Sequence, residues 1–402
     1  MTKYMRIITF FLLFAIMLIF GTIENIKGVT YPLIKTEFNA SWEQQGLLVS
    51  MLSLSYVGFC VVAGIFLGRF GIKPSILCGF AALSIGLLSA NFISSFFTAG
   101  AALFVMFAGF GFFEIGVNAL ASKVFIRKPA MLMNILHAFY GIGGFIGPII
   151  AGLLTNRAGL NWRMLYVLAL PVSLFLLIPS IFVKFPESRE EGGAQEAAKR
   201  KTFFNALENP KVWLLAIILG LGVTIEMSSP NWGAMYFQDI YGLDPRTSGA
   251  AFISAFFICF TVSRLVCGLL VERVGYMRFL TATTVVVLVI FTVGFLMGAR
   301  GIFLLPVLGF FIGPLWPTIM AIAITHFKKD APVFCSAMIA VGTVFYAGIQ
   351  YLVGLTNRFF GAAWGYRSAL LYTLILLTML VILGKKLKIE KESKNEINDS
   401  GT

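Results

Sequence analysis

Long apolar stretches alternate with short polar connections along this chain of 402 residues. The hydrocarbon core of a bilayer is about 30 Å thick, and a helix needs roughly 20 apolar residues to cross it. Stretches of this kind occur twelve times, and each predicts one membrane-spanning helix: 6–34, 45–68, 74–95, 97–122, 133–156, 163–184, 212–238, 247–271, 278–299, 302–326, 333–357 and 366–384. The pattern therefore predicts an all-α polytopic membrane protein with twelve transmembrane helices.

The composition agrees with this interpretation. Hydrophobic residues make up 58% of the chain and charged residues only 12%, about half the charged share of a soluble domain. A water-soluble fold could not bury so much apolar surface. The five cysteines lie inside apolar stretches without CxxC spacing, so we expect neither disulfides nor a metal site.

Three segments need separate interpretation. The first residues, MTKYMRIITFFLLFAIMLIF, resemble a signal peptide, but the apolar run is too long and no small-residue cleavage site follows it, so we expect a retained first helix. The one long polar segment, Lys184–Lys211, lies between the sixth and seventh apolar stretches. The charged tail from Lys385 is expected to be disordered.

The net charge of +13 is spread over short basic runs between apolar stretches. A nucleic-acid partner would require a basic surface or domain, so none is expected. With both termini in the cytoplasm, 22 of the 31 basic residues lie on the cytoplasmic side and 7 outside, while Lys27 and Arg264 lie within helices. The positive-inside rule therefore predicts a multi-pass protein of the plasma membrane with cytoplasmic N- and C-termini.

Three short motifs occur twice, about 200 residues apart and each time at the same point of a six-helix unit. They are LTNR (154–157 and 355–358), GRFG and ERVG (68–71 and 272–275), and NWR and GYR (161–163 and 365–367). Matches in phase indicate a duplication. We predict an N-terminal six-helix bundle, a cytoplasmic linker loop, a C-terminal six-helix bundle and a charged cytoplasmic tail, over residues 1–185, 186–211, 212–388 and 389–402.

The loops after the second and eighth stretches read GIFLGRFGIK (64–73) and GLLVERVGYMR (268–278). Both resemble G-x-x-x-[DE]-R-x-G-[RK], the signature of the major facilitator superfamily, in which two pseudo-symmetric six-helix bundles lie side by side. The first copy has Gly68 where an acid is usual. The resemblance implies a conformational latch between the bundles, to which we assign Arg69, Lys73, Arg264, Glu272 and Arg273. For Arg264, a structural role near the cytoplasmic end is the favoured interpretation.

A narrower resemblance lies mainly in the N-terminal half. It rests on Glu24-Asn25, on Glu114-x-x-x-Asn118, on Asn134-x-x-His137 and on the WPT of GPLWPTIMAIAI (313–324). Together these motifs resemble the fucose permease group of sugar–proton symporters, which is related to bacterial glucose/mannose symporters. Ala119 stands where a proline often follows the asparagine, and the first acid precedes its asparagine rather than following it.

Three carboxylates lie well inside apolar stretches: Glu24, Glu114 and Glu226. A charge at the centre of a spanning helix costs about 2.5–3.5 kcal/mol, so such groups are expected to be paired, protonated or facing water. We predict Glu114, with Glu24 as the second candidate, to carry a coupled proton. Asn118 follows Glu114 at i+4 and shares its helix face. The alternative for Glu114 is a hydrogen bond that ties two helices together.

Glu24 and Glu226 each have two interpretations. Lys27 at i+3 could neutralise Glu24, which would make Glu24 half of a structural ion pair, or Lys27 could extend to the outer membrane surface. Glu226 lies in a stretch that Pro230 should interrupt, because proline leaves the carbonyl four residues earlier without its usual donor. We expect this broken stretch to line a cavity, and a structural role for Glu226 is the alternative.

The remaining intramembrane polar and aromatic residues are candidates for solute binding. His137, Trp316 and Gln350 have packing as the alternative, since such side chains often only fill space in a membrane bundle. The complete predicted binding set is Asn25, Asn118, Asn134, His137, Glu226, Asn231, Trp232, Trp316 and Gln350.

The predicted function is secondary active transport, most consistent with proton-coupled import of a monosaccharide or similar small polar solute. The protein is expected to use the proton gradient without a cofactor, to act on solute and protons within the lipid bilayer, and to function as a monomer. It contains no enzymatic motif. The alternative is proton-driven efflux of amphipathic drugs or metabolites, because G-x-x-x-G-P-x-x-A-G (143–152) resembles a motif of drug–proton antiporters. A sensor or scaffold on the same fold usually carries an appended signalling domain or a very long loop, and we expect neither here.

Overall fold

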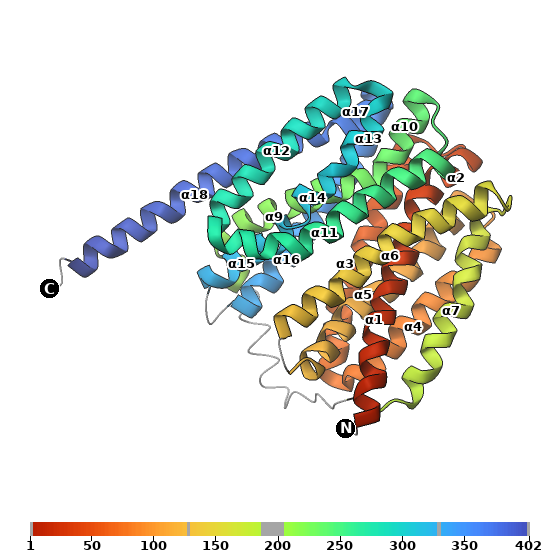
Figure 1. The fold of residues 1–402 in the computed structure, drawn as a ribbon, viewed down its shortest axis with the longest axis horizontal. Coiled ribbons are helices and arrows are strands. Elements are labelled where there is room, and N and C mark those ends of the chain that lie inside the picture. Colours follow the sequence, from red (N-terminus) through yellow and green to blue (C-terminus); the bar gives the residue numbers. More distant parts are fainter. Residues whose placement is uncertain (1–2, 127–128, 186–204, 328–330, 400–402) are drawn as a thin grey trace.

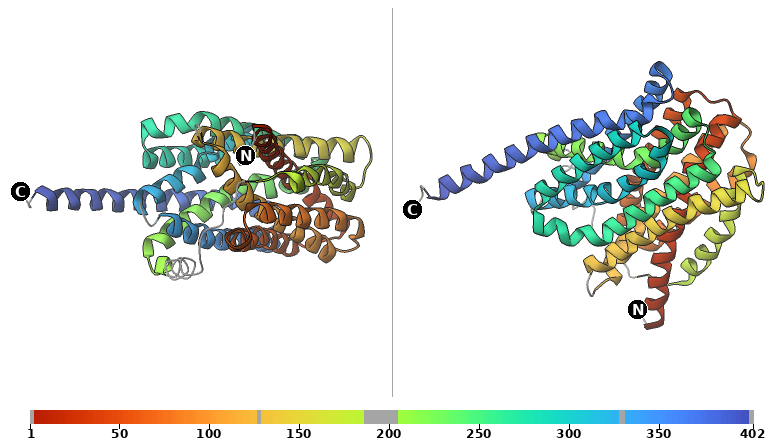
Figure 2. Two further views of the ribbon diagram at one scale, coloured as in Figure 1. Left: turned by 90° about the horizontal axis from the view of Figure 1, so that it is seen from below. Right: turned by 45° about the horizontal axis from the view of Figure 1, so that its top comes forward.

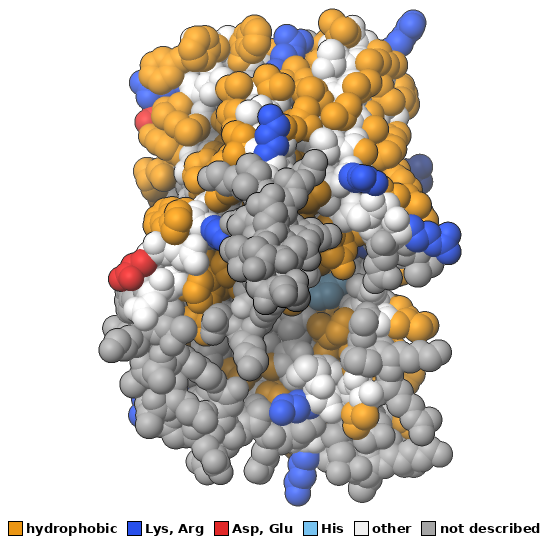
Figure 3. Space-filling view, turned by 90° about the vertical axis from the view of Figure 1, so that its left-hand side faces the viewer, with side chains coloured by type: hydrophobic (Ala, Val, Ile, Leu, Met, Phe, Trp, Pro, Cys, Tyr) orange, Lys and Arg blue, Asp and Glu red, His pale blue; other side chains and the backbone are white. Residues whose placement is uncertain are grey.

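The computed structural model describes residues 3–126, 129–185, 205–327 and 331–399, and its helices form the bundle shown in Figure 1. Twelve helical spans are long and apolar enough to cross a membrane, which confirms the predicted number. The described residues contain no β-strand. Most of the predicted linker, residues 186–204, lies outside the described residues. Where Figure 3 shows described side chains, apolar ones predominate, as expected for a surface that contacts lipid.

Eight helical elements build the N-terminal half: α1 (Lys3–Asn25), α2 (Lys27–Glu37), α3 (Trp42–Phe70), α4 (Ile72–Ser89), η1 (Ala90–Phe92), α5 (Phe96–Val124), α6 (Pro129–Asn156) and α7 (Trp162–Phe182). Polar caps start α3 and α5 where the chain turns back into the bundle. Ser41 accepts a hydrogen bond from the backbone N–H of Gln44, and Ser95 does the same for Thr98. These caps satisfy N–H groups that have no partner within the helix.

The C-terminal half is more fragmented. Its elements are α9 (Pro210–Ser228), η2 (Ser229–Gly233), α10 (Ala234–Tyr241), η3 (Pro245–Gly249), α11 (Ala250–Val274), α12 (Tyr276–Leu296), η4 (Gly298–Arg300), α13 (Gly301–Leu304), η5 (Leu305–Val307), α14 (Leu308–Ile312), α15 (Leu315–Phe327), α16 (Ala331–Phe360), α17 (Trp364–Arg367) and α18 (Ala369–Asp399). The π-helical turn η2 contains Pro230, so the break predicted at this proline is confirmed. π-Helical turns inside helices are frequent at functional sites.

The structure departs from two expectations. The first predicted helix, 6–34, is divided at Ile26 into α1 and α2. The tail was expected to be disordered, but α18 continues through it to Asp399 and projects beyond the bundle in both views of Figure 2. The physical reason is composition: the tail is rich in lysine and glutamate, which favour helix, and contains neither proline nor glycine between Lys385 and Asp399.

The duplicated motifs occupy equivalent places in the two halves. Gly71 and Gly275 follow α3 and α11, and their φ angles are +89° and +88°. Residues with a Cβ rarely adopt such angles, which explains why both copies of the motif keep glycine at the turn. LTNR lies in the last turns of α6 and again near the end of α16. The internal repeat predicted from the sequence is therefore present in the structure.

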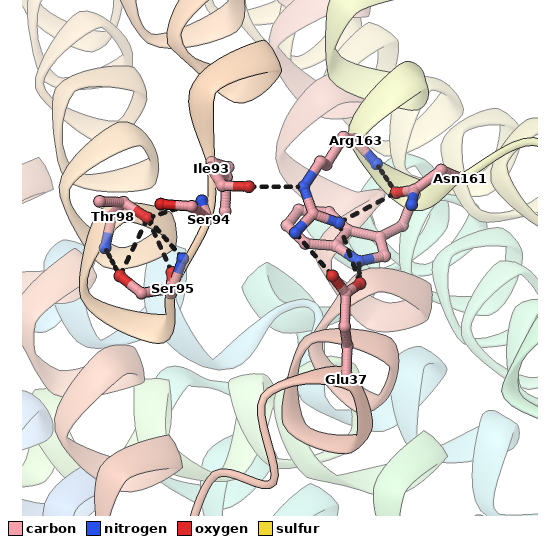
Figure 4. A network of polar contacts seen from close by, with 8 residues as sticks. Glu37, Ile93, Ser94, Ser95, Thr98, Asn161 and Arg163 are labelled. Carbon is pink, nitrogen blue, oxygen red and sulfur yellow. Dashed lines mark hydrogen bonds and ion pairs between the residues drawn. The ribbon is translucent and has the colours of Figure 1, made fainter.

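Each half also has its own arginine clamp at the distal end, by which we mean the end opposite the N-terminus, at the upper right in Figure 1. Figure 4 shows the clamp of the N-terminal half, in which Arg163 binds both carboxylate oxygens of Glu37 at 2.6 and 2.9 Å. Arg163 also donates to the backbone carbonyl of Ile93 at 3.0 Å. In the C-terminal half Arg367 instead donates to the Tyr236 hydroxyl at 3.2 Å. The clamps tie each half together.

The two halves meet along α3 with α16 and along α6 with α11, in both cases toward the distal end. Gly46 lies against Gly354, and a Cβ at Gly46 would stand 2.9 Å from the Gly354 Cα. A Cβ at Gly152 would likewise stand 2.2 Å from the Arg246 carbonyl oxygen. Only glycine permits such close backbone contact. The glycine-rich stretch of α6 therefore serves helix packing.

Ion pairs across the two halves reinforce the distal end. Lys35 lies 3.0 Å from Asp239, and Arg358 contacts Glu43. Lys35 also lies over the Trp42 ring, 4.1 Å from its centroid. The structure is therefore closed at the distal end.

Candidate functional site

Charged and polar side chains from both halves gather midway along the helices. We call this group the central polar cluster: Glu24, Asn25, Lys27, Glu114, Asn118, His137, Tyr140, Glu226, Asn231, Trp232, Arg264, Tyr346 and Gln350. Side chains of the two halves come close here, because Glu24 lies within electrostatic range of Glu226, and Arg264 lies within range of His137. The cluster thus brings together most residues that the sequence analysis assigned to proton coupling and solute binding.

Glu24 is neutralised within its own half. The Lys27 ammonium lies 2.7 Å from one carboxylate oxygen, and the Tyr140 hydroxyl donates to the other at 2.6 Å. The break at Ile26 places this lysine beside the acid. Lys27 is buried, with 5% of its surface exposed, so it does not extend to the membrane surface. Of the two interpretations of Glu24, the structure contains the ion pair.

Glu114 has a different environment. The Asn118 amide donates to the Glu114 carboxylate at 2.9 Å and to the Glu114 backbone carbonyl at 2.7 Å, so the predicted i+4 contact is confirmed. Within the described part of the chain, no lysine or arginine nitrogen lies within 4.0 Å of this carboxylate. Tyr56 and His137 are within electrostatic range of it. Glu114 is therefore the carboxylate of the cluster without a cationic partner.

Glu226 faces Arg264 across the C-terminal half. The closest nitrogen–oxygen distance is 3.9 Å, which is longer than a hydrogen bond. The guanidinium lies 4.3 Å from the centroid of the Phe260 ring, and its Nε is buried without a partner among the described residues. Arg264, which the sequence analysis grouped with the latch, thus lies with the binding residues instead. The two ions are close enough to attract each other but remain free to bind other groups.

Amide side chains form the distal part of the cluster. The Trp232 indole N–H donates to the Gln350 carbonyl at 2.8 Å, and Asn231 donates to the Tyr346 hydroxyl at 3.1 Å. The turn η2 directs both neighbours, Asn231 and Trp232, toward α16. Among the described residues, the Asn231 Oδ1, the Gln350 Nε2 and the Asn25 Oδ1 are buried without partners. A buried amide atom costs about 1–3 kcal/mol when unpaired, so these atoms are suited to bind a polar solute.

Other predicted residues lie outside the cluster. Asn134 is exposed near the start of α6, and Trp316 is 37% exposed near the start of α15. At the proposed latch, Arg69 and Arg273 are exposed, and Lys73 donates to the backbone carbonyl of Ile181. The side chain of Glu272 is not among those that the structure describes. The structure therefore leaves the latch assignment as a prediction.

Sequence reasoning did not single out Tyr140, Tyr346 or Gln45. Gln45 is fully buried, and both its amide atoms lack partners among the described residues. Tyr140 follows His137 at i+3 on α6, so a search for polar residues along one helix face could have found it. Tyr346 precedes Gln350 at i+4 on α16, so the same search could have found it, whereas Gln45 has no comparable signal.

Comparisons with known proteins agree with this fold. The sequence profile of the Major Facilitator Superfamily matches residues 12–349. A protein of Helicobacter pylori named "Putative glucose/galactose transporter" is 23% identical over 329 residues, which cover 77% of this chain and 79% of the relative. "Bypass of stop codon protein 6" of Saccharomyces cerevisiae is 26% identical over 294 residues, and the match covers 61% of this chain but only 56% of the yeast protein.

Among solved structures, a single-residue variant of the fucose:proton symporter FucP of E. coli has a similar fold. It superposes with a TM-score of 0.66 over 94% of this chain and 98% of FucP. The sequences are 17% identical, so this similarity concerns the fold alone.

Proposed function

Because this chain belongs to the Major Facilitator Superfamily, a family of membrane transporters rather than enzymes, we propose that it imports a monosaccharide or a similar small polar solute together with protons. The observation that carries the proposal is the composition of the central polar cluster. It combines a carboxylate without a cationic partner, Glu114, with amide groups that have unpaired atoms. The carboxylate can bind a proton, and the amides can form hydrogen bonds with hydroxyl groups of a solute.

Glu114 is the proposed proton carrier. Its carboxylate lies inside a spanning segment and accepts a hydrogen bond from the neutral Asn118 amide, so a proton can bind there without the loss of an ion pair. Lys27 and Tyr140 already stabilise the charge of Glu24, so binding a proton there would require the loss of an ion pair. Each proton that moves inward at 100 mV supplies about 2.3 kcal/mol, enough to accumulate a neutral solute nearly fiftyfold.

The solute is proposed to bind between the halves, against the amides of Asn231 and Gln350 and the carboxylate–arginine pair of Glu226 and Arg264. Loosely paired groups can exchange their partners at little cost. A sugar hydroxyl suits them as a new partner, because it can both donate and accept a hydrogen bond. Rocking of the halves would then expose the solute to either side of the membrane. In this mechanism, a state with a closed distal end exposes the solute toward the termini, which we place in the cytoplasm of a cell with the protein in its plasma membrane.

One further similarity supports this assignment. The relative from Helicobacter pylori is named a putative glucose/galactose transporter. The efflux alternative rests on the G-x-x-x-G-P motif. In the structure Gly143 and Gly147 pack against the backbone of Leu18 and Thr22 in α1, a packing role that requires neither drug nor antiport.

The test is uptake of a panel of labelled monosaccharides by cells that express the protein, with and without a protonophore. We expect accumulation of at least one sugar, and we expect the protonophore to abolish it. If no sugar accumulates in cells with verified surface expression, the import proposal fails. If expression of the protein makes the same cells resistant to drugs, that result would favour efflux.

A further inference from the structure

A pocket of about 210 Å³ lies at the distal end, where α6 of one half meets η3 and α11 of the other. Its rim carries one arginine from each half, Arg157 and Arg246. Asn156 and Thr247 add hydrogen-bond donors, and none of the nine lining residues is acidic. The pocket is smaller than a typical small-molecule site, for which about 300–1,000 Å³ is usual. Its size and charge suit a compact anion.

The position of the pocket points to the source of that anion. The span that contains α6 ends at Asn156, and the span that contains α11 begins at Pro245, so the pocket lies at the level where spanning segments end. Polar lipid headgroups occupy this level. Apolar residues continue from the pocket along α6, and Leu153 and Ile150 are 45% and 41% exposed. An arginine pair above an exposed apolar surface matches a lipid that has a phosphate head and acyl chains.

The charges also create a need for such a ligand. Arg157 and Arg246 come from opposite halves and line one pocket, so closure of the distal end brings two like charges to the same small site. The backbone contact between Gly152 and the Arg246 carbonyl leaves little freedom for the halves to separate there. A bound anion would compensate the two positive charges, because charge-assisted hydrogen bonds to phosphate are among the strongest that arginine makes.

We propose that this pocket binds the phosphodiester headgroup of an anionic phospholipid, with an acyl chain along Leu153 and Ile150. Since the ligand contacts both halves, it stabilises the state in which the distal end is closed. The site is distinct from the central polar cluster, and the proposal does not depend on the identity of the transported solute.

The experiment measures thermal unfolding of the full chain in detergent during titration with dioleoylphosphatidylglycerol. We expect a saturable rise in Tm for the unaltered protein. In the double variant R157Q/R246Q the apparent lipid affinity should fall about tenfold or more, because two charge-assisted contacts are lost. R157K/R246K, which keeps both charges, should retain most of the shift. R300Q is the matched control, since Arg300 is also exposed at the distal end but does not line the pocket.

Three outcomes would overturn the proposal. Equal lipid stabilisation of R157Q/R246Q and the unaltered protein would show that the arginines do not hold the lipid. An equal rise in Tm with inorganic phosphate alone would indicate a free-anion site. An equal rise with dioleoylphosphatidylcholine would show that the anionic headgroup is not recognised. If R157Q/R246Q fails to fold, the single variants R157Q and R246Q answer the same question.

Discussion

The two halves of this protein repeat the same short motifs at equivalent positions, yet they contribute different chemistry to its centre. The first helical span of each half breaks at an equivalent position, at Ile26 and at Pro230, 204 residues apart. After the first break comes Lys27, which neutralises Glu24. After the second comes Asn231, an amide with an unpaired oxygen. Breaks at equivalent positions thus place an ion pair in one half and hydrogen-bonding groups in the other.

This difference suggests a division of labour. In the N-terminal half Glu24 is paired and Glu114 is not, so that half holds one carboxylate able to exchange a proton at low cost. In the C-terminal half the amides and the loose pair of Glu226 and Arg264 provide several donors and acceptors for a solute. Variants in one half should therefore affect energy coupling, and variants in the other should affect solute affinity.

The largest effect is expected from Glu114→Gln. Glutamine retains the shape and the hydrogen bond to Asn118 but cannot exchange a proton. The accumulation ratio should fall from as much as about fiftyfold at 100 mV to about one, because the gradient no longer drives uptake. Counterflow exchange of labelled solute in proteoliposomes should continue. Full concentrative uptake by this variant would contradict the division of labour.

A second prediction concerns Glu226 and Arg264. Removal of one charged group leaves the other buried or half-buried without its partner. Both single variants, Glu226→Gln and Arg264→Gln, should therefore bind solute more weakly. The double variant should be less impaired than the sum of the two, with a coupling energy of about 0.5–3 kcal/mol. Solute affinity measured over this double-mutant cycle checks the prediction, and additive effects would show that the two groups act independently.

A smaller effect is expected from Gln350→Ala. The change removes the acceptor of the Trp232 indole and one proposed contact to the solute. Loss of such hydrogen bonds costs about 1–2 kcal/mol, which corresponds to roughly a 5- to 30-fold rise in KM. The number of protons moved per solute should stay the same. A change in the number of protons per solute would show that Gln350 takes part in proton coupling. The proposed contrast between a coupling half and a solute-binding half would then be wrong.

The smallest effect is expected at the distal ion pair of Lys35 and Asp239. The pair is partly exposed, with 18% and 24% of its side-chain surfaces accessible. Such pairs contribute about 0.2–1 kcal/mol, and salt screens them. Asp239→Asn should shift the balance between the two transport states by roughly fivefold at most, as measured by spectroscopic distances across the distal end. An unchanged balance at low salt would mean that this pair is not needed and that the glycine contacts and the pair of Arg358 and Glu43 hold this end closed.

The sequence was sufficient for most of the architecture. The spans were predicted from twelve apolar stretches, and the duplication was predicted from the paired motifs. The interruption after α9 was predicted from Pro230. Each of these features depends on local composition or on a single backbone rule. The helical tail was not predicted, since its charge indicated disorder although its residues favour helix. The division of the first span at Ile26 was also missed, because the nearest proline, Pro32, lies six residues beyond it and a single glycine, Gly28, is a weak signal of a break.

The site was predictable in its members but not in its pairings. Intramembrane position identified Glu24, Glu114 and Glu226, because buried charges are rare enough to stand out. The partners of these acids were harder to find. Only the i+3 and i+4 neighbours could be anticipated, whereas Tyr140 reaches Glu24 from α6, and Arg264 reaches Glu226 from α11. Contacts between distant helices depend on helix rotation and tilt, which one sequence does not specify.

The central claim is that Glu114 carries the proton while the amides of the C-terminal half hold the solute. The most direct test is solute-induced proton flux in proteoliposomes, recorded with a pH-sensitive dye for the unaltered protein, Glu114→Gln and Gln350→Ala. We predict that solute addition produces proton uptake in the unaltered protein, that Gln350→Ala needs more solute for the same flux, and that Glu114→Gln shows none. Undiminished proton flux in Glu114→Gln would contradict the account.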